Sequence, residues 1–283
     1  ILCDITYGEI NQAALSLEEY RATYVGHTRG RKTVSYRLEQ QFCLAIQAQI
    51  RRQEGAGREE LYRILEEAVK LTVPLPWEKS LEGRVLSLKE LNLLLEMEQY
   101  REGGGQEAHY RAVLAYMENT GLDGIGRAKL YPKAVYLLCR CLMGEDADGQ
   151  GYGVAAKGED ANGRDHGVGA KGKDVGGQNL GILTQLLTCC NLAVECLRDN
   201  GRMYYLWELL DMRERLLGRM AESLRAEGEK RKAEALEPMR QENAEWKGAL
   251  ESAYTEFQVP KEMVSCTYLY VEKGVSCIND VIR

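Results

Sequence analysis

The sequence lacks a basic excess and long apolar runs, and both absences narrow the classes of partner. It holds 37 Lys and Arg against 43 Asp and Glu, a formal net charge of −6. Phosphate backbones require a positively charged surface, so we do not expect this chain to bind nucleic acid by itself. No run of 18 apolar residues occurs, so we expect no transmembrane helix and no membrane partner. The nine scattered Cys are typical of buried thiols in a reducing cytoplasm.

Strict polar–apolar alternation is also lacking, and nearly every patterned segment has helical spacing instead. We therefore predict an all-α protein built of helix pairs joined by short Gly- or Asn-containing turns. Pairs that recur every 34 to 40 residues or so are typical of a tetratricopeptide-like helical-repeat solenoid; a non-repetitive helical bundle is the alternative. The segments with this pattern cover residues 36–50, 61–69, 88–95, 110–117, 126–142, 180–198, 202–219, 221–236 and 240–257.

Several short motifs predict where these helices begin and end. Ser87-Leu88-Lys89-Glu90 has the form of a capping box, in which Ser and Glu satisfy free backbone N–H groups. Pro74 and Pro76 should end the helix before them, because proline lacks the N–H that a helix needs. The turns at 119–121 and 200–201 resemble helix ends closed by a left-handed glycine. We expect one helical-repeat part over 1–143 and a second over 179–272.

Residues 144–178 interrupt the helical pattern. They contain 11 of the 29 Gly and repeat with a period of 14, since Gly144–Gly149 recurs as Gly158–Gly163 with one change. The segment has few bulky apolar residues, and burying them cannot offset the conformational entropy lost on ordering the chain. We therefore expect a mobile loop inserted between two antiparallel helices. Asp146, Asp148 and Gly151 resemble the start of a calcium-binding loop. Lys157, however, stands where such a loop needs a bidentate Glu, which argues against calcium.

No grouping of residues indicates catalysis, a metal or a cofactor. The three His lie in different segments, and no Ser/His/acid or Cys/His set can be read. The insertion should bring together two Cys-bearing helices, but Cys139 and Cys141 point apart on one helix and cannot share a metal. Only Cys189 and Cys196 share a face. We therefore expect core packing for these thiols and predict that the chain is not an enzyme.

Polar and aromatic side chains in or beside the helix pairs are the remaining candidates for ligand binding. An Asn amide can pair with the backbone of an extended peptide, and helical arrays bind such peptides on their concave face. The alternative for each residue is a helix cap or a place in the core. The candidate ligand-binding residues are Asn92, Asn191, Arg202, Tyr204 and Tyr205.

The end of the chain has the pattern of a helix that has just begun. Ile278, Val281 and Ile282 have helical spacing, and Asn279 and Asp280 are typical of a first turn. No stop signal follows. Because the chain also begins at an Ile, we expect both ends to be cut from a longer protein, with 273–283 opening a further domain.

Two segments of the second half, 191–208 and 268–283, resemble the helical region of bacterial helix-turn-helix regulators with tetratricopeptide-like repeats, of the Lachnospiraceae type in Firmicutes. In that family an Ile-Asn-Asp-Val-Ile-Arg ending runs into the first helix of a helix-turn-helix domain. In architecture the chain is similar to Rgg and PlcR type peptide-sensing regulators. This resemblance implies a signalling peptide or small ligand, a homodimer, and DNA contact only through a domain outside this chain.

Two hypotheses follow. The first is the cytoplasmic sensor and oligomerisation region of a transcriptional regulator, whose ligand changes the spacing of attached DNA-binding domains. The alternative is a passive helical-repeat adaptor that binds a protein partner and no small ligand.

Overall fold

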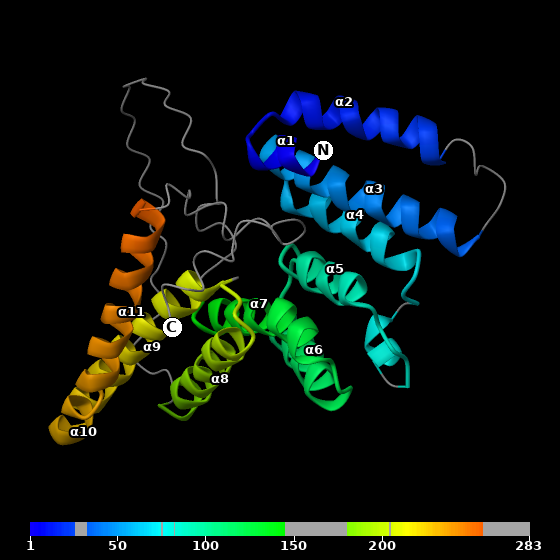
Figure 1. Cartoon of the computed structure of the whole chain (residues 1–283). Coiled ribbons are helices and arrows are strands. Elements are labelled where there is room, and N and C mark those ends of the chain that lie inside the picture. The colour runs from blue at the N-terminus through cyan, green and yellow to red at the C-terminus, as the bar shows by residue number, and fades with distance from the viewer. Residues whose placement is uncertain (26–32, 75, 82, 145–179, 204, 257–283) are drawn as a thin grey trace, which may run out of the picture.

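The computed structural model describes residues 1–25, 33–74, 76–81, 83–144, 180–203 and 205–256. Over these residues the chain is all-helical, with no strand, as the sequence predicts (Figure 1). A π-helical turn, η1 (Arg21–Val25), and a 3₁₀ turn, η3 (Trp77–Leu81), accompany the α-helices. The α-helices are α1 (Leu2–Thr6), α2 (Ile10–Tyr20), α3 (Val34–Gln53), α4 (Arg58–Lys70), α5 (Leu88–Glu98), α6 (Gln106–Asn119), α7 (Gly124–Leu142), α8 (Leu180–Asp199), α9 (Leu206–Ala226), α10 (Lys230–Glu234) and α11 (Glu237–Glu256).

Three predictions concern residues outside the described ranges. These are the loop over 144–178 beyond its first residue, the end of the second repeat part from 257 to 272, and the incipient helix over 273–283.

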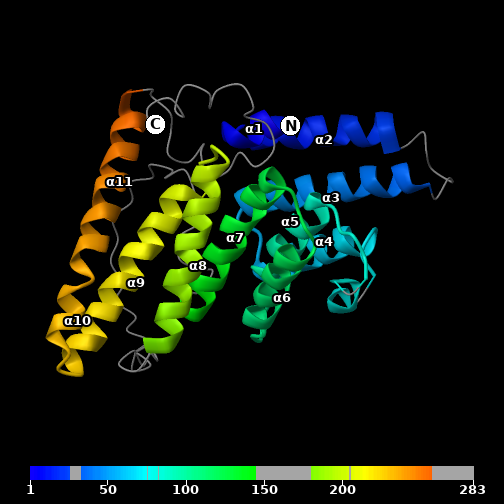
Figure 2. The ribbon, with the colours of Figure 1, turned by 60° about the horizontal axis from the view of Figure 1, so that its bottom comes forward.

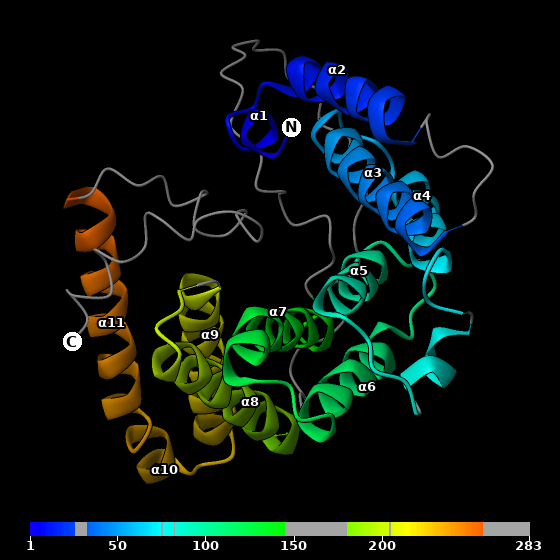
Figure 3. The ribbon, with the colours of Figure 1, turned by 45° about the vertical axis from the view of Figure 1, so that its right-hand side comes forward.

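The helices are arranged in an open arc that runs from α2 to α11 (Figure 3). Each helix from α3 to α9 packs on the next, and α5, α7, α9 and α11 also pack on one another in that order. The helices α7, α8, α9 and α11 stand side by side, whereas α2 and α3 run crosswise to them (Figure 2). In Figure 3, α5, α7 and α9 lie toward the inside of the curve and α6 and α8 toward the outside.

The predicted helix ends are confirmed where the chain is described. Ser87 accepts a hydrogen bond from the backbone N–H of Glu90, whose side chain accepts one from the N–H of Ser87, so the capping box is complete. Gly121 and Gly201 adopt φ of 64° and 57°, the left-handed conformation that closes α6 and α8. Asp123 caps α7 by accepting from the N–H of Gly126 at 2.7 Å.

Two details of the helical prediction are wrong. The segments 202–219 and 221–236 do not form two helices, because α9 continues through Met220 and Ala221 to Ala226 and is followed by the short α10. Leu38 of α3 belongs to the segment 36–50, whose helical spacing predicts one shared apolar face, but its side chain is exposed. The helix packs between α2 and α4 and buries two different faces, one with Cys43, Ile46 and Ile50, the other with Gln41 and Ala48.

The main hydrophobic core is contiguous from α3 to α11 and has α7 at its centre. Eleven of the nineteen residues of α7 are buried, because it packs on α5, α6, α8 and α9. A separate small core joins α1, α2 and α3 through Ile5, Ala13, Leu17, Cys43, Ile46 and Ile50.

The helix α8 is long and apolar enough to cross a membrane by length and composition, the only such helix in the described part of the chain. In the structure it packs between α7 and α9 and buries Leu183, Leu186, Leu187, Cys190 and Leu197 against them. Of the apolar stretch in α8, 33% is buried inside the structure, and Ile182 and Leu192 on the same helix are exposed.

Candidate functional site

The inner side of the array carries a line of polar side chains along α7. Lys129, Lys133, Tyr136 and Arg140 recur at helical spacing and so share one side of this helix. We call these four residues the α7 stripe. Lys129, Tyr136 and Arg140 are half-buried, whereas Lys133 is only 2% exposed. The burial of Lys133 in the core is unusual, because buried charges need partners.

Lys133 is held by two side chains of α5. Its Nζ donates to Asn92 Oδ1 at 2.8 Å and forms an ion pair with Glu96. Burial acts to raise the pKa of Glu96, but Lys133 and Arg52 outweigh it and hold that pKa below its usual value. Asn92 and Glu96 are one turn apart on α5, so both can reach the same ammonium group.

On the other side, Tyr136 joins the α7 stripe to the start of α9. Its ring lies 5.6 Å from the ring of Tyr205, and the guanidinium of Arg140 lies 5.7 Å from the centroid of Tyr136. Tyr205 caps α9 with a φ of 61°, the only non-glycine residue with positive φ in the described chain. A tyrosine held in that conformation is strained. The strained backbone places its ring against α7.

The next helix along the inside continues this mixture of aromatic and charged side chains. Lys247 of α11 lies 5.1 Å from the ring centroid of Trp207 on α9. It also donates to Asp211 Oδ1 at 3.0 Å and to Glu214 Oε2 at 2.8 Å. Polar contacts thus join α5 to α7, aromatic contacts join α7 to α9, and both kinds join α9 to α11.

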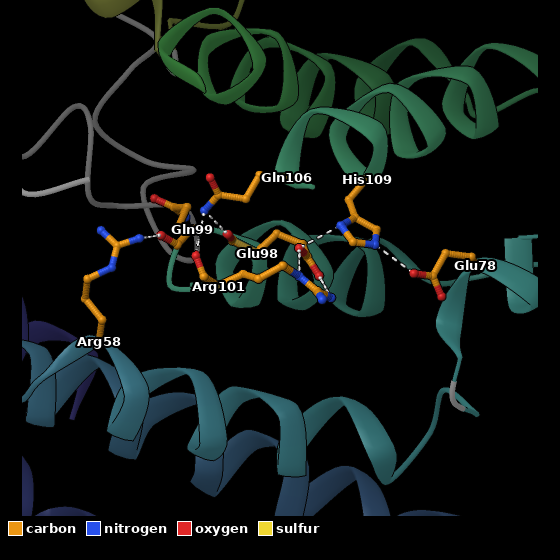
Figure 4. Close-up of polar contacts among 7 residues, drawn as sticks. All are labelled: Arg58, Glu78, Glu98, Gln99, Arg101, Gln106 and His109. Atoms are coloured by element: carbon orange, nitrogen blue, oxygen red, sulfur yellow. Dashed lines mark hydrogen bonds and ion pairs between the residues drawn. The ribbon is translucent and has the colours of Figure 1, made fainter. Parts of the chain in front are cut away.

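A second polar cluster lies between η3, α5 and α6 (Figure 4). Glu98, 1% exposed, accepts two hydrogen bonds from Arg101, at 2.6 and 2.7 Å. Its Oε2 also lies 3.0 Å from Nδ1 of His109, whose Nε2 is 2.7 Å from Glu78 Oε1. Burial acts to raise the pKa of Glu78, but its own backbone N–H and His109 outweigh it, so the pKa is lowered.

The backbone around Glu98 is fixed by further side chains (Figure 4). Gln106 donates to the carbonyls of Glu98 and Arg101, at 2.8 and 3.2 Å, and Arg58 donates to the carbonyl of Gln99 at 3.0 Å. These bonds satisfy carbonyls that the end of α5 leaves free. The ring of Trp77 lies 4.9 Å from that of His109. The cluster therefore ties the end of α5 to α4 and α6.

The chemistry of the second cluster is that of a structural network. The buried carboxylate of Glu98 has a bidentate partner in Arg101, and Nδ1 and Nε2 of His109 lie 3.0 Å from Glu98 and 2.7 Å from Glu78. Within the ranges that the structure describes, no group of three or more His, Cys, Asp or Glu could hold a metal ion.

The structure brings two of the five predicted ligand-binding residues to the α7 stripe. Asn92 contacts Lys133, and Tyr205 contacts Tyr136, one turn further along α7. Asn191 lies half-buried on α8, and its Oδ1 is buried without a hydrogen-bond partner. The N–H of Arg202 donates to the carbonyl of Leu197 and closes α8. Tyr204 lies outside the described residues.

The sequence analysis missed the ion pair between Lys133 of the α7 stripe and Glu96 of α5. It also missed the grouping of His109 with two carboxylates. One available signal was the spacing of Lys129, Lys133, Tyr136 and Arg140 in a helix with many apolar residues. The partners Glu78, Glu98 and His109 lie on three different elements, and only packing brings them together.

No protein-family model, no curated protein and no solved structure matches this chain. Its resemblance to helix-turn-helix regulators therefore remains a prediction from the quoted residues.

Proposed function

We propose that this chain is the sensor and oligomerisation region of a bacterial transcriptional regulator, with a tetratricopeptide-like arrangement of its helices. It binds a peptide or small ligand on the inner side of the array, along the α7 stripe, and dimerises in the cytoplasm. The ligand favours one curvature of the array and so changes the spacing of DNA-binding domains that lie outside this chain.

The observation that supports this proposal is the packing of α5, α7, α9 and α11 on one another along the inside of the arc. A ligand that contacts the α7 stripe would touch helices from both halves of the chain, since Lys133 is bonded to α5 and Tyr136 packs on Tyr205 before α9. Half-buried tyrosines offer apolar area and a hydroxyl at low entropic cost, which suits a peptide backbone.

The test is a calorimetric titration of the purified chain with a library of short synthetic peptides, with the mass of the free and bound protein measured by light scattering. We expect binding by a subset of peptides and a dimer. Tyr136→Ala should weaken binding about tenfold or more, a loss typical of an aromatic anchor. Leu192→Ala, at an exposed position of α8, should leave the affinity unchanged.

Failure of every peptide to bind, together with a monomeric mass under all conditions, would overturn the sensor proposal. Capture of a stable protein partner through the same residues, without any peptide binding, would instead support the passive adaptor.

A further inference from the structure

Two thiols on different helices face each other in the centre of the core. The Sγ atoms of Cys139 on α7 and Cys190 on α8 lie 3.6 Å apart. Both side chains are 0% exposed. The two residues are 51 positions apart in the sequence, so only the packing of α7 on α8 brings them together. Neither thiol belongs to the α7 stripe or to the second polar cluster, the one around Glu98.

Other cysteines nearby do not share this geometry. Cys141 and Cys189 are half-buried, and burial raises the pKa of both thiols. Cys189 is next to Cys190 and within electrostatic range of Cys139, so it is the competitor that any test must separate. Among the described cysteines, only Cys139 and Cys190 are in direct sulfur–sulfur contact.

We propose that Cys139 and Cys190 are a disulfide-forming modification site that links α7 to α8 when the protein meets a hydroperoxide. One thiol attacks the peroxide, the O–O bond breaks, and a sulfenic acid forms with release of the corresponding alcohol, which is water when the oxidant is hydrogen peroxide. The second thiol then attacks the sulfenic sulfur, an S–S bond forms and a water leaves. The peroxide accepts two electrons in total. To form this bond the sulfurs must approach from 3.6 Å to about 2.05 Å.

The link would join two helices in the middle of the array. α7 packs on α5, α6, α8 and α9, so fixing it to α8 restrains the centre of the arc. A bond between positions 51 apart also restricts the unfolded chain, and we expect the oxidised protein to unfold at higher denaturant concentration than the reduced protein. This inference does not rest on the proposed function.

The experiment is oxidation of the folded, full chain with hydrogen peroxide, followed by alkylation of remaining thiols, trypsin digestion and mass spectrometry. Trypsin cleaves after Lys133 and Arg140, which separates Cys139 from Cys141. We expect the peptide 134–140 to be joined to the peptide 174–198 and released by dithiothreitol. Because both thiols are buried, the link should form more slowly than oxidation of the exposed Cys3.

Single variants identify the partner within 174–198, which also holds Cys189 and Cys196. The joined peptide should fall about tenfold or more in Cys190→Ala and stay within about twofold in Cys189→Ala and Cys196→Ala. Fragmentation of the wild-type peptide between residues 189 and 190 gives the same assignment without a variant, so a folding defect in Cys190→Ala does not decide the result. A link that maps to Cys189, or no joined peptide after peroxide exposure continued far beyond full oxidation of Cys3, would overturn the proposal. So would the same mixture of links in guanidinium-unfolded protein, because the pairing would then not come from the fold.

Discussion

The first three helices bury their apolar side chains less completely than the central block of α6 to α9. The small core of α1 to α3 holds six buried apolar residues, and large apolar side chains beside it are exposed, among them Tyr7, Leu15 and Leu38. In the central block α7 alone buries eleven residues and is covered by four helices. A helix with neighbours on all sides removes most of its apolar surface from water, which stabilises the fold. An edge helix leaves part of its apolar surface in water.

The largest test of this comparison replaces one leucine in each region with alanine. Leu138 on α7 and Leu17 on α2 are 2% and 3% exposed, so their chemistry and burial match. We expect Leu138→Ala to lower the free energy of unfolding by about 4 kcal/mol and Leu17→Ala by about 2 kcal/mol, because the open edge can collapse around a cavity. Urea unfolding followed by circular dichroism measures both. Equal losses would show that the edge packs as rigidly as the centre.

Lys133 of the central block forms an ion pair with Glu96 on α5, and removing the charge of Glu96 should cost nearly as much. Glu96→Gln leaves the ammonium of Lys133 buried without its counter-charge, a change that costs about 3 kcal/mol. The double variant Glu96→Gln with Lys133→Met removes both charges and should recover most of that loss. If the double variant is no more stable than Glu96→Gln, the cost does not come from the loss of the charge on Glu96 beside Lys133.

The ion pair between Lys133 and Glu96 should also make the free energy of unfolding depend on pH in the acidic range. The folded pKa of Glu96 lies below its ordinary value of 4.5, so its stabilisation is present above pH 4.5 and is lost as pH falls through the folded pKa. Chemical denaturation from pH 6 downward should therefore show a shallower loss of stability in Glu96→Gln than in the wild type. An identical slope would contradict the charge state assigned to Glu96.

Sequence reasoning succeeded where a local group sets the structure and failed where a distant helix does. The capping box at Ser87 and the left-handed glycines Gly121 and Gly201 need only neighbouring residues. The burial of Lys133 and the contact of Cys139 with Cys190 depend on which helices pack together. Helical spacing identifies an apolar face, but in α7 nearly every face has a neighbour.

The Glu98 cluster, which joins the edge side of the array to the centre, should be less sensitive. Glu98→Gln keeps the shape of the side chain but weakens the bidentate bond to Arg101 and the contact with His109, so we expect a loss of about 2 kcal/mol. Glu59→Gln is the matched control, since Glu59 and Arg63 form a surface pair with side chains 72% and 71% exposed. It should change stability by less than about 0.5 kcal/mol. A comparable effect of both substitutions would mean that the cluster is no stronger than a surface ion pair.

The smallest expected effect is an increase in the free energy of unfolding. It tests whether a substitution in the central block can still stabilise the protein. Gly218 lies within α9, and a Cβ added there would meet no atom within 4 Å. Alanine restricts the unfolded chain more than glycine and has the higher helix propensity, so Gly218→Ala should raise the free energy of unfolding by about 0.7 kcal/mol. Gly121→Ala has equally open surroundings, but its φ of 64° is unfavourable for alanine, so a loss of about 1 kcal/mol is expected. Thermal unfolding of the two variants separates backbone conformation from packing, since neither new methyl group touches a neighbour. A loss of stability in both variants would contradict this expectation. It would mean that the native conformation of α9 at Gly218 favours glycine over alanine, even though the added Cβ meets no atom within 4 Å.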